Sequence, residues 1–182
     1  RDRCIILRPG VVERSGEASN LKVDISKFFD KTYTLEQGYV EGGDILRINN
    51  HFIIGISGRT NETGAKNLSN IIEKNGGTSE IAKTPENTLH FKSECSLLDE
   101  ETILATDNLI KSDFFNKKYR IIKVPKGEET GANCLRINEH LLIPKGYDRL
   151  LDLVSKDYKI RVLDVTEMEK VDAGLSCLSL RW

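Results

Sequence analysis

A nine-residue stretch occurs twice in this chain, as Leu46-Arg47-Ile48-Asn49-Asn50-His51-Phe52-Ile53-Ile54 and as Leu135-Arg136-Ile137-Asn138-Glu139-His140-Leu141-Leu142-Ile143. Each copy reads as a strand, a tight turn at Asn49-Asn50 or Asn138-Glu139, and a second strand. β-Branched and leucine side chains in both arms are typical of β-hairpins. The chain is therefore predicted to contain two equivalent hairpins.

A helical pattern follows each hairpin. Asn61–Lys74 carries apolar side chains at helical spacing, and either Thr60 or Asn61 is suited to cap the N-terminus of this helix. Tyr147–Leu153 predicts a shorter helix, and a strand follows it over Lys159–Leu163. The repeated element is thus a hairpin plus a helix.

Further copies of this element are weaker. Cys95–Leu104 also reads as strand, acidic turn and strand, and Ser176–Leu180 echoes the strand pattern of Ser93–Leu97. Cys4–Arg8, followed by a helix up to Phe29, resembles the tail of another unit. Because a strand is already in progress there, we expect the chain to lack the N-terminal part of a longer protein.

Units of this kind cannot bury their apolar faces alone, so they pack around a common centre. The predicted fold is an α/β, pseudo-symmetric ring in which the inner strands end at a central hole. No linker or low-complexity stretch divides the 182 residues, so we expect residues 1–182 to form a single domain.

Composition and charge exclude several classes of function. With 27 basic and 28 acidic side chains the net charge is −1, which leaves no electrostatic footprint for nucleic acid. The apolar stretches are too short to span a bilayer. The four cysteines lack CxxC or Cys/His spacing suited to a metal, and such scattered thiols predict a reducing compartment, the cytosol.

The three histidines are candidates for acid–base chemistry, since an imidazole can donate and accept a proton near neutral pH. His51 and His140 take equivalent places in the two hairpins, which favours a scaffold role for both. His90 stands outside the repeat, at the junction of a loop and a strand. It is either a catalytic group or a satisfied histidine at a strand edge, and the local sequence fits both.

Cys177 differs from the other cysteines. Cys4, Cys95 and Cys134 lie within strand patterns, where a thiol behaves as a small buried apolar group. Cys177 follows Gly174 and has small polar neighbours, which leave room around the sulfur. It is the candidate nucleophile, with a buried inert thiol as the alternative, and its thiolate would need a cationic neighbour or substrate.

Glu41-Gly42-Gly43-Asp44 precedes the first hairpin, and its counterpart before the second hairpin is the uncharged Thr130-Gly131-Ala132-Asn133. The two glycines let the backbone turn sharply and bring both acids to one place. Charges at one of two equivalent sites suggest a role specific to that site, either orienting a histidine or meeting a cation. A polar turn before a strand is the plainer alternative.

Ser57-Gly58-Arg59-Thr60-Asn61 follows the first hairpin and runs into the predicted helix. An arginine beside a helix N-terminus suits a carboxylate ligand. An exposed arginine at a turn fits the same pattern equally well.

Taken together, these strings resemble the dimethylarginine dimethylaminohydrolase (dimethylargininase) family, pentein-fold enzymes that modify guanidino groups. The matching strings run in order along essentially the whole chain: Leu7-Arg8-Pro9-Gly10 with Arg14, Glu41-Gly42-Gly43-Asp44, Gly55-Ile56-Ser57-Gly58-Arg59-Thr60-Asn61, Leu89-His90-Phe91-Lys92-Ser93, Ala132-Asn133-Cys134-Leu135, and Glu169-Lys170-Val171-Asp172 leading to Ser176-Cys177. The resemblance implies a pentein-type α/β propeller without its N-terminal unit or units, because the family's acidic N-terminal region has no match here. Leu178 stands where many members have a second cysteine.

The resemblance also implies roles for individual residues. Cys177 is implied to attack a guanidinium carbon, His90 to protonate the departing amine and then activate water, and Glu41 to orient the imidazole. The implied intermediate is a covalent S-alkylthiouronium. The substrate-binding residues implied are Arg14 and Arg59, for the substrate's α-carboxylate, and Asp172, near the nucleophile.

The expected reaction is hydrolysis of N-methylated arginine to citrulline and an amine, with no metal and no organic cofactor. An arginine deiminase or an amidinotransferase on the same scaffold is the alternative enzyme. A guanidine-binding or structural fragment without turnover is the alternative outside catalysis. The expected partner is a small guanidino compound, not nucleic acid or a membrane, and the sequence leaves the oligomeric state open.

Overall fold

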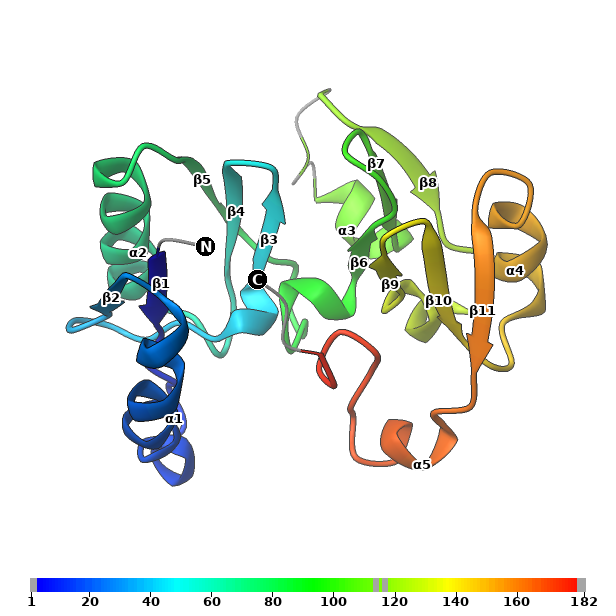
Figure 1. Cartoon of the computed structure of the whole chain (residues 1–182). Coiled ribbons are helices and arrows are strands. Elements are labelled where there is room, and N and C mark those ends of the chain that lie inside the picture. Colours follow the sequence, from blue (N-terminus) through cyan, green and yellow to red (C-terminus); the bar gives the residue numbers. More distant parts are fainter. Residues whose placement is uncertain (1–2, 113–114, 116–117, 180–182) are drawn as a thin grey trace. The chain divides into compact units, whose positions relative to one another are not determined.

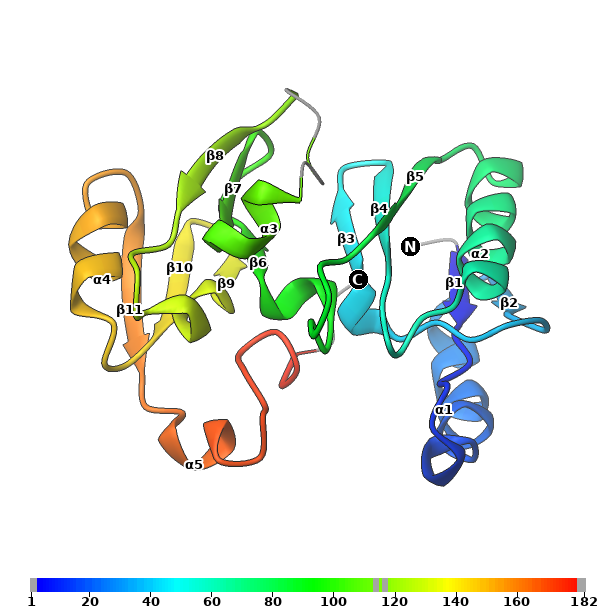
Figure 2. The ribbon, with the colours of Figure 1, turned by 180° about the vertical axis from the view of Figure 1, so that it is seen from behind.

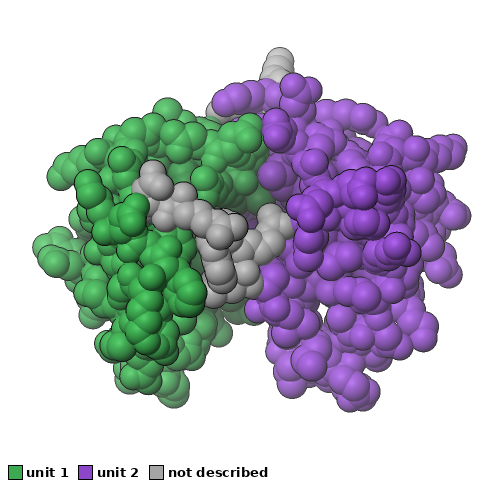
Figure 3. Space-filling view, in the orientation of Figure 1, with its two compact units in different colours: residues 1–90, 182 green, residues 91–181 purple. Residues whose placement is uncertain are grey.

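The computed structural model describes residues 3–112, 115 and 118–179. Two compact units are distinguished, unit 1 with residues 1–90 and 182, and unit 2 with residues 91–181 (Figure 3). Each unit has its own sheets and its own apolar core. That residues 1–182 form a single domain stays a prediction.

Both predicted hairpins are confirmed. In unit 1, β3 (Ile45–Ile48) and β4 (His51–Ile56) pair antiparallel, and Asn49 turns the chain with a φ of 56°. In unit 2, β9 (Leu135–Ile137) and β10 (His140–Pro144) do the same, and Asn138 has a φ of 53°. Asparagine tolerates this left-handed conformation better than most residues, which is why it stands at both turns.

Helix α2 (Glu62–Lys74) follows the first hairpin and leads to β5 (Thr78–Lys83), which pairs parallel with β4. Asn61 caps this helix, because its Oδ1 accepts a hydrogen bond from the backbone N of Gly64 at 2.8 Å. Figure 2 shows α2 alongside β5. One core cluster of unit 1 contains Leu35, Val40, Ile54, Ala65, Leu68 and Ile72.

The order of hairpin, helix and parallel strand recurs in unit 2. The third predicted copy forms β6 (Cys95–Leu97) and β7 (Thr102–Ala105), followed by α3 (Asp107–Lys111) and β8 (Arg120–Lys123). Strand β7 pairs antiparallel with β6 and parallel with β8. The hairpin of this copy is confirmed, whereas its helix and last strand were not predicted.

The second hairpin continues into α4 (Asp148–Val154) and β11 (Lys159–Leu163), as predicted. Strand β11 pairs parallel with β10, so each full copy is a three-stranded mixed sheet with a helix in its crossover (Figure 1). One core cluster of unit 2 contains Leu98, Leu104, Val124, Ala132, Cys134, Leu141, Ile143, Leu150 and Val154.

The start of the chain repeats the crossover without a hairpin. Strand β1 (Arg3–Ile6) pairs parallel with β2 (Lys31–Thr34). Helix α1 (Glu17–Ile25) joins them, flanked by the 3-10 turns η1 (Val12–Arg14) and η2 (Ser26–Phe28). The strand and helix predicted for this region are confirmed.

The end of the chain differs from its prediction. Helix α5 (Thr166–Glu169) leads into turns and irregular chain over residues 170–179, not into a strand. The backbone N of Cys177 donates to O of Gly174 at 3.0 Å, so this group closes a local turn instead of joining a sheet. The expected echo of the strand at Ser93–Leu97 is therefore wrong for residues 176–179, and Leu180 lies outside the described residues.

Candidate active site

Glu41 and His90 meet in unit 1. Glu41 precedes the 3-10 turn η3 (Gly42–Asp44), and His90 stands immediately before the 3-10 turn η4 (Phe91–Ser93). Nε2 of His90 lies 2.8 Å from Oε2 of Glu41, within hydrogen-bond distance. The structure thus brings together two of the candidate site residues.

Gly43 makes this close approach sterically possible. A Cβ at position 43 would lie 2.6 Å from Cγ of His90. Such a distance is well inside van der Waals contact, so any side chain here would push the ring away. Packing of the imidazole on the turn therefore requires glycine at this position.

Glu41 is a buried carboxylate among cationic groups. The residue is 5% exposed, its Oε2 lies 3.1 Å from Nη1 of Arg14, and its Oε1 lies 3.5 Å from Nη1 of Arg59. A buried charge needs such partners because removal from water penalises it. Oε1 receives no hydrogen bond from the described residues, so it is able to accept an N–H donor.

Arg14 and Arg59, expected to hold a substrate carboxylate, are both paired with Glu41 in this structure. Arg14 also donates to Glu17 from Nε and Nη2, at 3.1 and 2.9 Å, and this hydrogen bonding raises the pKa of Arg14. The side chains of Arg14 and Arg59 are 45% and 33% exposed. An incoming carboxylate would therefore compete with Glu41 for two accessible guanidinium groups.

Asp44 holds the loop that carries Arg59. Its Oδ2 accepts hydrogen bonds from Oγ of Ser57 and Oγ1 of Thr60, both at 2.7 Å, and the residue is 0% exposed. Oγ of Ser57 in turn accepts from the backbone N of Arg59 at 2.9 Å. The sequence pattern groups Asp44 with Glu41, but the two acids have different partners in the structure. The hydroxyls of Ser57 and Thr60 are the sequence signal for the role of Asp44.

Cys177 lies in unit 2, where its residue is exposed. Asn133 contacts this turn through both ends of its amide, because Oδ1 accepts from the backbone N of Ser176 at 2.9 Å and Nδ2 lies 4.0 Å from Sγ of Cys177. In the sequence, Asn133 stands out as the uncharged counterpart of Asp44 and as part of one of the matching strings, but it was not predicted to be a site residue. Its place in the repeat was the signal that could have identified it.

The other cysteines are less accessible. Cys95 and Cys134 are buried, as predicted, and desolvation raises the pKa of both thiols, to about 12 for Cys134. Cys4, in β1, is partly exposed and thus less enclosed than predicted. All four thiols are free.

His51 and His140 both begin the second strand of a hairpin. Nδ1 of His51 lies 2.8 Å from Oγ1 of Thr78, so this ring joins β4 to β5. The contact agrees with the scaffold role expected for His51.

Asp172 follows α5 in an exposed turn and has a φ of 56°. Its backbone N donates to O of Glu169 at 3.1 Å. Within residues 3–112, 115 and 118–179 its carboxylate forms no salt bridge. Its expected role near the nucleophile stays a prediction.

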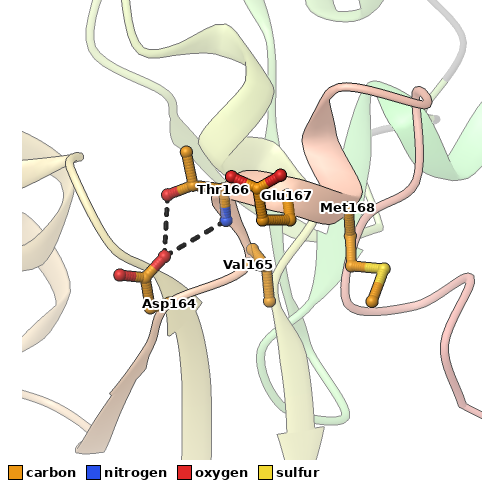
Figure 4. A pocket seen from close by; sticks show the side chains of 5 residues that line it. All are labelled: Asp164, Val165, Thr166, Glu167 and Met168. Carbon is orange, nitrogen blue, oxygen red and sulfur yellow. Dashed lines mark hydrogen bonds between the residues drawn. The ribbon is translucent and has the colours of Figure 1, made fainter.

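A surface hollow in unit 2 lies beside α5 and is lined by Asp164, Val165, Thr166, Glu167 and Met168 (Figure 4). The Oγ1 and backbone N of Thr166 donate to Oδ1 of Asp164 at 2.7 and 3.2 Å, and these hydrogen bonds lower the pKa of Asp164 to about 2. The carboxylate thus holds Thr166, the first residue of the short helix. The predicted site residues do not line this hollow.

Among the described residues, no group of three or more His, Cys, Asp or Glu side chains is arranged to hold a metal ion. No helix in that part of the chain is both long and apolar enough to cross a membrane.

The chain is similar to known enzymes along nearly its whole length. The family model for arginine deiminase matches residues 21–142. An N(G),N(G)-dimethylarginine dimethylaminohydrolase of Pseudomonas aeruginosa is 35% identical over 184 residues, covering 99% of this chain and 72% of the relative. This chain belongs to the dimethylarginine dimethylaminohydrolase family.

Solved structures of dimethylarginine dimethylaminohydrolases share the fold. The Pseudomonas aeruginosa enzyme, as a cysteine-to-serine variant complexed with citrulline, matches with a TM-score of 0.92 and 34% identity over 98% of this chain and 70% of that chain. A histidine-to-glycine variant in an adduct with S-methyl-L-thiocitrulline matches with the same TM-score and identity. The predicted fold class is therefore confirmed, and the repeated mixed sheets are those of the pentein fold.

Proposed function

We propose that this protein hydrolyses the guanidino group of an N-methylated arginine, with citrulline and an amine as products. The observation that carries the proposal is the contact between Glu41 and His90, because a buried carboxylate 2.8 Å from an imidazole fixes the orientation of a ring that can transfer a proton. Membership of the dimethylarginine dimethylaminohydrolase family supports the same reaction, and citrulline is the compound bound in the related Pseudomonas aeruginosa structure.

Cys177 is the proposed nucleophile, since its thiol is exposed and the other cysteines are more enclosed. A guanidinium carbon is a poor electrophile because its charge is delocalised, and it calls for a soft, strong nucleophile such as a thiolate. The thiolate bonds to this carbon, and the bond to the methylated nitrogen breaks as His90 gives that nitrogen a proton. The product of this half-reaction is an S-alkylthiouronium.

In the hydrolysis of the intermediate, the imidazole of His90 acts as a base instead of an acid. His90, now neutral, takes a proton from water while the water oxygen bonds to the thiouronium carbon. The carbon–sulfur bond then breaks, which restores the thiolate, and the proton left on the added oxygen is lost to solvent as the C=O of citrulline forms. The amine has already left with the proton it received.

Substrate binding is assigned to the charged groups around Glu41. Its Oε1 accepts no hydrogen bond from the described residues and is proposed to receive an N–H of the guanidinium. Arg14 and Arg59 are proposed to release Glu41 and to bind the substrate's α-carboxylate instead. Asp172 is the third proposed substrate-binding residue. We further propose that the two units act as one catalytic domain, located in the cytosol.

An arginine deiminase is the second candidate, because the family model for that enzyme matches residues 21–142. Purified protein given asymmetric dimethylarginine, arginine, or arginine plus glycine distinguishes the reactions. Citrulline from the methylated substrate supports the proposal, citrulline mainly from arginine supports the deiminase, and guanidinoacetate indicates an amidinotransferase. A folded protein that forms no product in any assay would support a binding or structural role.

Cys177→Ser tests the mechanism. We expect this variant to keep the fold, measured by circular dichroism, and to lose turnover. Turnover that persists at the parent's rate would overturn the proposed nucleophile.

A further inference from the structure

We propose that Asn133 is a positioning residue for Cys177, one that fixes the place of the sulfur and presents an N–H donor to it. The inference rests on the proposed function, because it assigns Asn133 a part in the chemistry of that nucleophile. It concerns contacts within unit 2 alone.

The orientation of the Asn133 amide follows from its partners. The backbone N–H of Ser176 can only donate, so the amide atom 2.9 Å from it must be the carbonyl oxygen Oδ1. Nδ2 therefore faces Sγ of Cys177, at 4.0 Å. An N–H donor, not an acceptor, is presented to the proposed nucleophile.

Packing holds this amide in place. Asn133 is 8% exposed, and a Cβ at Gly174 would lie 2.4 Å from its Nδ2. On the other side, the backbone N of Asn133 donates to O of Thr130 at 3.2 Å, within the turn that leads into β9. The amide is thus clamped between the segment before the second hairpin and the turn of Cys177.

The residue at the equivalent position of the first hairpin copy also anchors a neighbouring segment, but it is charged. Asp44 stands where Asn133 stands in the repeat, and it fastens the loop of Arg59 through the hydroxyls of Ser57 and Thr60 at 2.7 Å. Both residues therefore secure a segment that carries a proposed site residue. The member beside the thiol is the uncharged one.

This difference in charge has a chemical reason. A carboxylate beside the sulfur would oppose ionisation of the thiol, because two negative charges at such a distance destabilise each other. An amide N–H facing the sulfur instead stabilises the thiolate by donating to it. Asparagine thus fits a thiol that has to ionise for the proposed attack.

Asn133→Asp distinguishes the anchoring of the Ser176 backbone from the effect of a charge beside the sulfur. Aspartate keeps the shape and an oxygen for the N–H of Ser176, but it places a negative charge beside the sulfur. We expect the pH midpoint of Cys177 alkylation by iodoacetamide, read by peptide mass spectrometry, to rise by about one unit, and kcat at neutral pH to fall ~10-fold with KM little changed. Asn133→Ala removes the anchor and the donor, and its midpoint should rise as well.

Asn138→Asp is the matched control. It makes the same substitution in the same hairpin copy, in the exposed turn after β9, where the φ of 53° suits either residue. We expect its alkylation profile and kcat to equal those of the parent. An unshifted profile in folded Asn133→Asp, or in Asn133→Ala if the first variant does not fold, would overturn the proposal.

Failure of the proposed function gives a different result. If Cys177→Ser kept its turnover, Cys177 would not be the nucleophile. The alkylation test would remain valid, because it measures the reactivity of the Cys177 thiol directly. The contact of Asn133 with the sulfur is therefore tested whichever reaction the protein performs.

Discussion

Nε2 of His90 lies 2.8 Å from Oε2 of Glu41, although 49 positions separate the two residues in the sequence. The carboxylate is buried, so its charge acts on the imidazole with little screening by water. A carboxylate in this place fixes the orientation of the imidazole that is proposed to protonate the departing amine. Removing that charge is the most direct test of the proposed acid.

Glu41→Gln should lower kcat by ~10²-fold while the fold is kept. Glutamine has the same shape but lacks the charged oxygen that holds Nε2 of His90, so the ring is less firmly oriented for proton transfer. Steady-state kinetics at saturating substrate measure kcat. Glu17→Gln is the matched control, because Glu17 also pairs with Arg14 but its side chain is 58% exposed. Equal losses in the two variants would contradict the role of Glu41.

Gly43→Ala should lower kcat strongly, whereas the melting temperature should change little. The added methyl group would lie 2.6 Å from Cγ of His90, so the ring has to leave its place beside Glu41. Gly42→Ala is the control, because its methyl group would meet only Cδ1 of Leu7 at 4.0 Å. We expect Gly42→Ala to keep its activity. Equal losses of kcat in the two variants would show that distortion of the turn, not displacement of the imidazole, lowers the activity.

Asp44→Ala should lower the free energy of unfolding by about 2–3 kcal/mol, because the hydroxyls of Ser57 and Thr60 lose their acceptor inside the protein. Asp44→Asn keeps an acceptor oxygen, so about 1 kcal/mol is expected for it. Urea unfolding followed by circular dichroism measures both values. An alanine variant as stable as the parent would contradict the anchoring role of Asp44.

Arg59→Ala should raise KM for methylated arginine by ~10–10²-fold, since a charged hydrogen bond to the substrate's α-carboxylate is lost. For a methylated guanidino substrate without that carboxylate, we expect the variant and the parent to have the same KM. Steady-state kinetics with both substrates measure the difference. A penalty of equal size for the two substrates would exclude Arg59 as a ligand of the carboxylate.

Alkylation near pH 8 should modify Cys177 before the other thiols. Burial raises the pKa of Cys95 and Cys134, so both stay protonated and unreactive at this pH, while partly exposed Cys4 should react more slowly than Cys177. Unfolding in urea exposes every thiol and serves as the positive control. Peptide mass spectrometry over time gives the order, and early modification of Cys134 would contradict it.

Local sequence was sufficient for the repeated elements. The hairpin at β3 and β4 follows from alternating apolar residues around Asn49, and α2 follows from its apolar spacing and the cap at Asn61. Each of these signals lies within one hairpin or one helical turn. The end of the chain failed as a prediction because a few residues around Cys177 resemble a strand, whereas their hydrogen bonds close a turn.

The candidate residues Glu41, His90 and Cys177 could be selected from the sequence because their types and order are distinctive. Their partners could not be selected in this way. The pairing of Arg14 with Glu41 and the clamp of Asn133 on Ser176 join segments far apart in the chain. Such contacts depend on the desolvation of charged and polar groups once the sheets have packed, a condition that no short pattern of residues encodes.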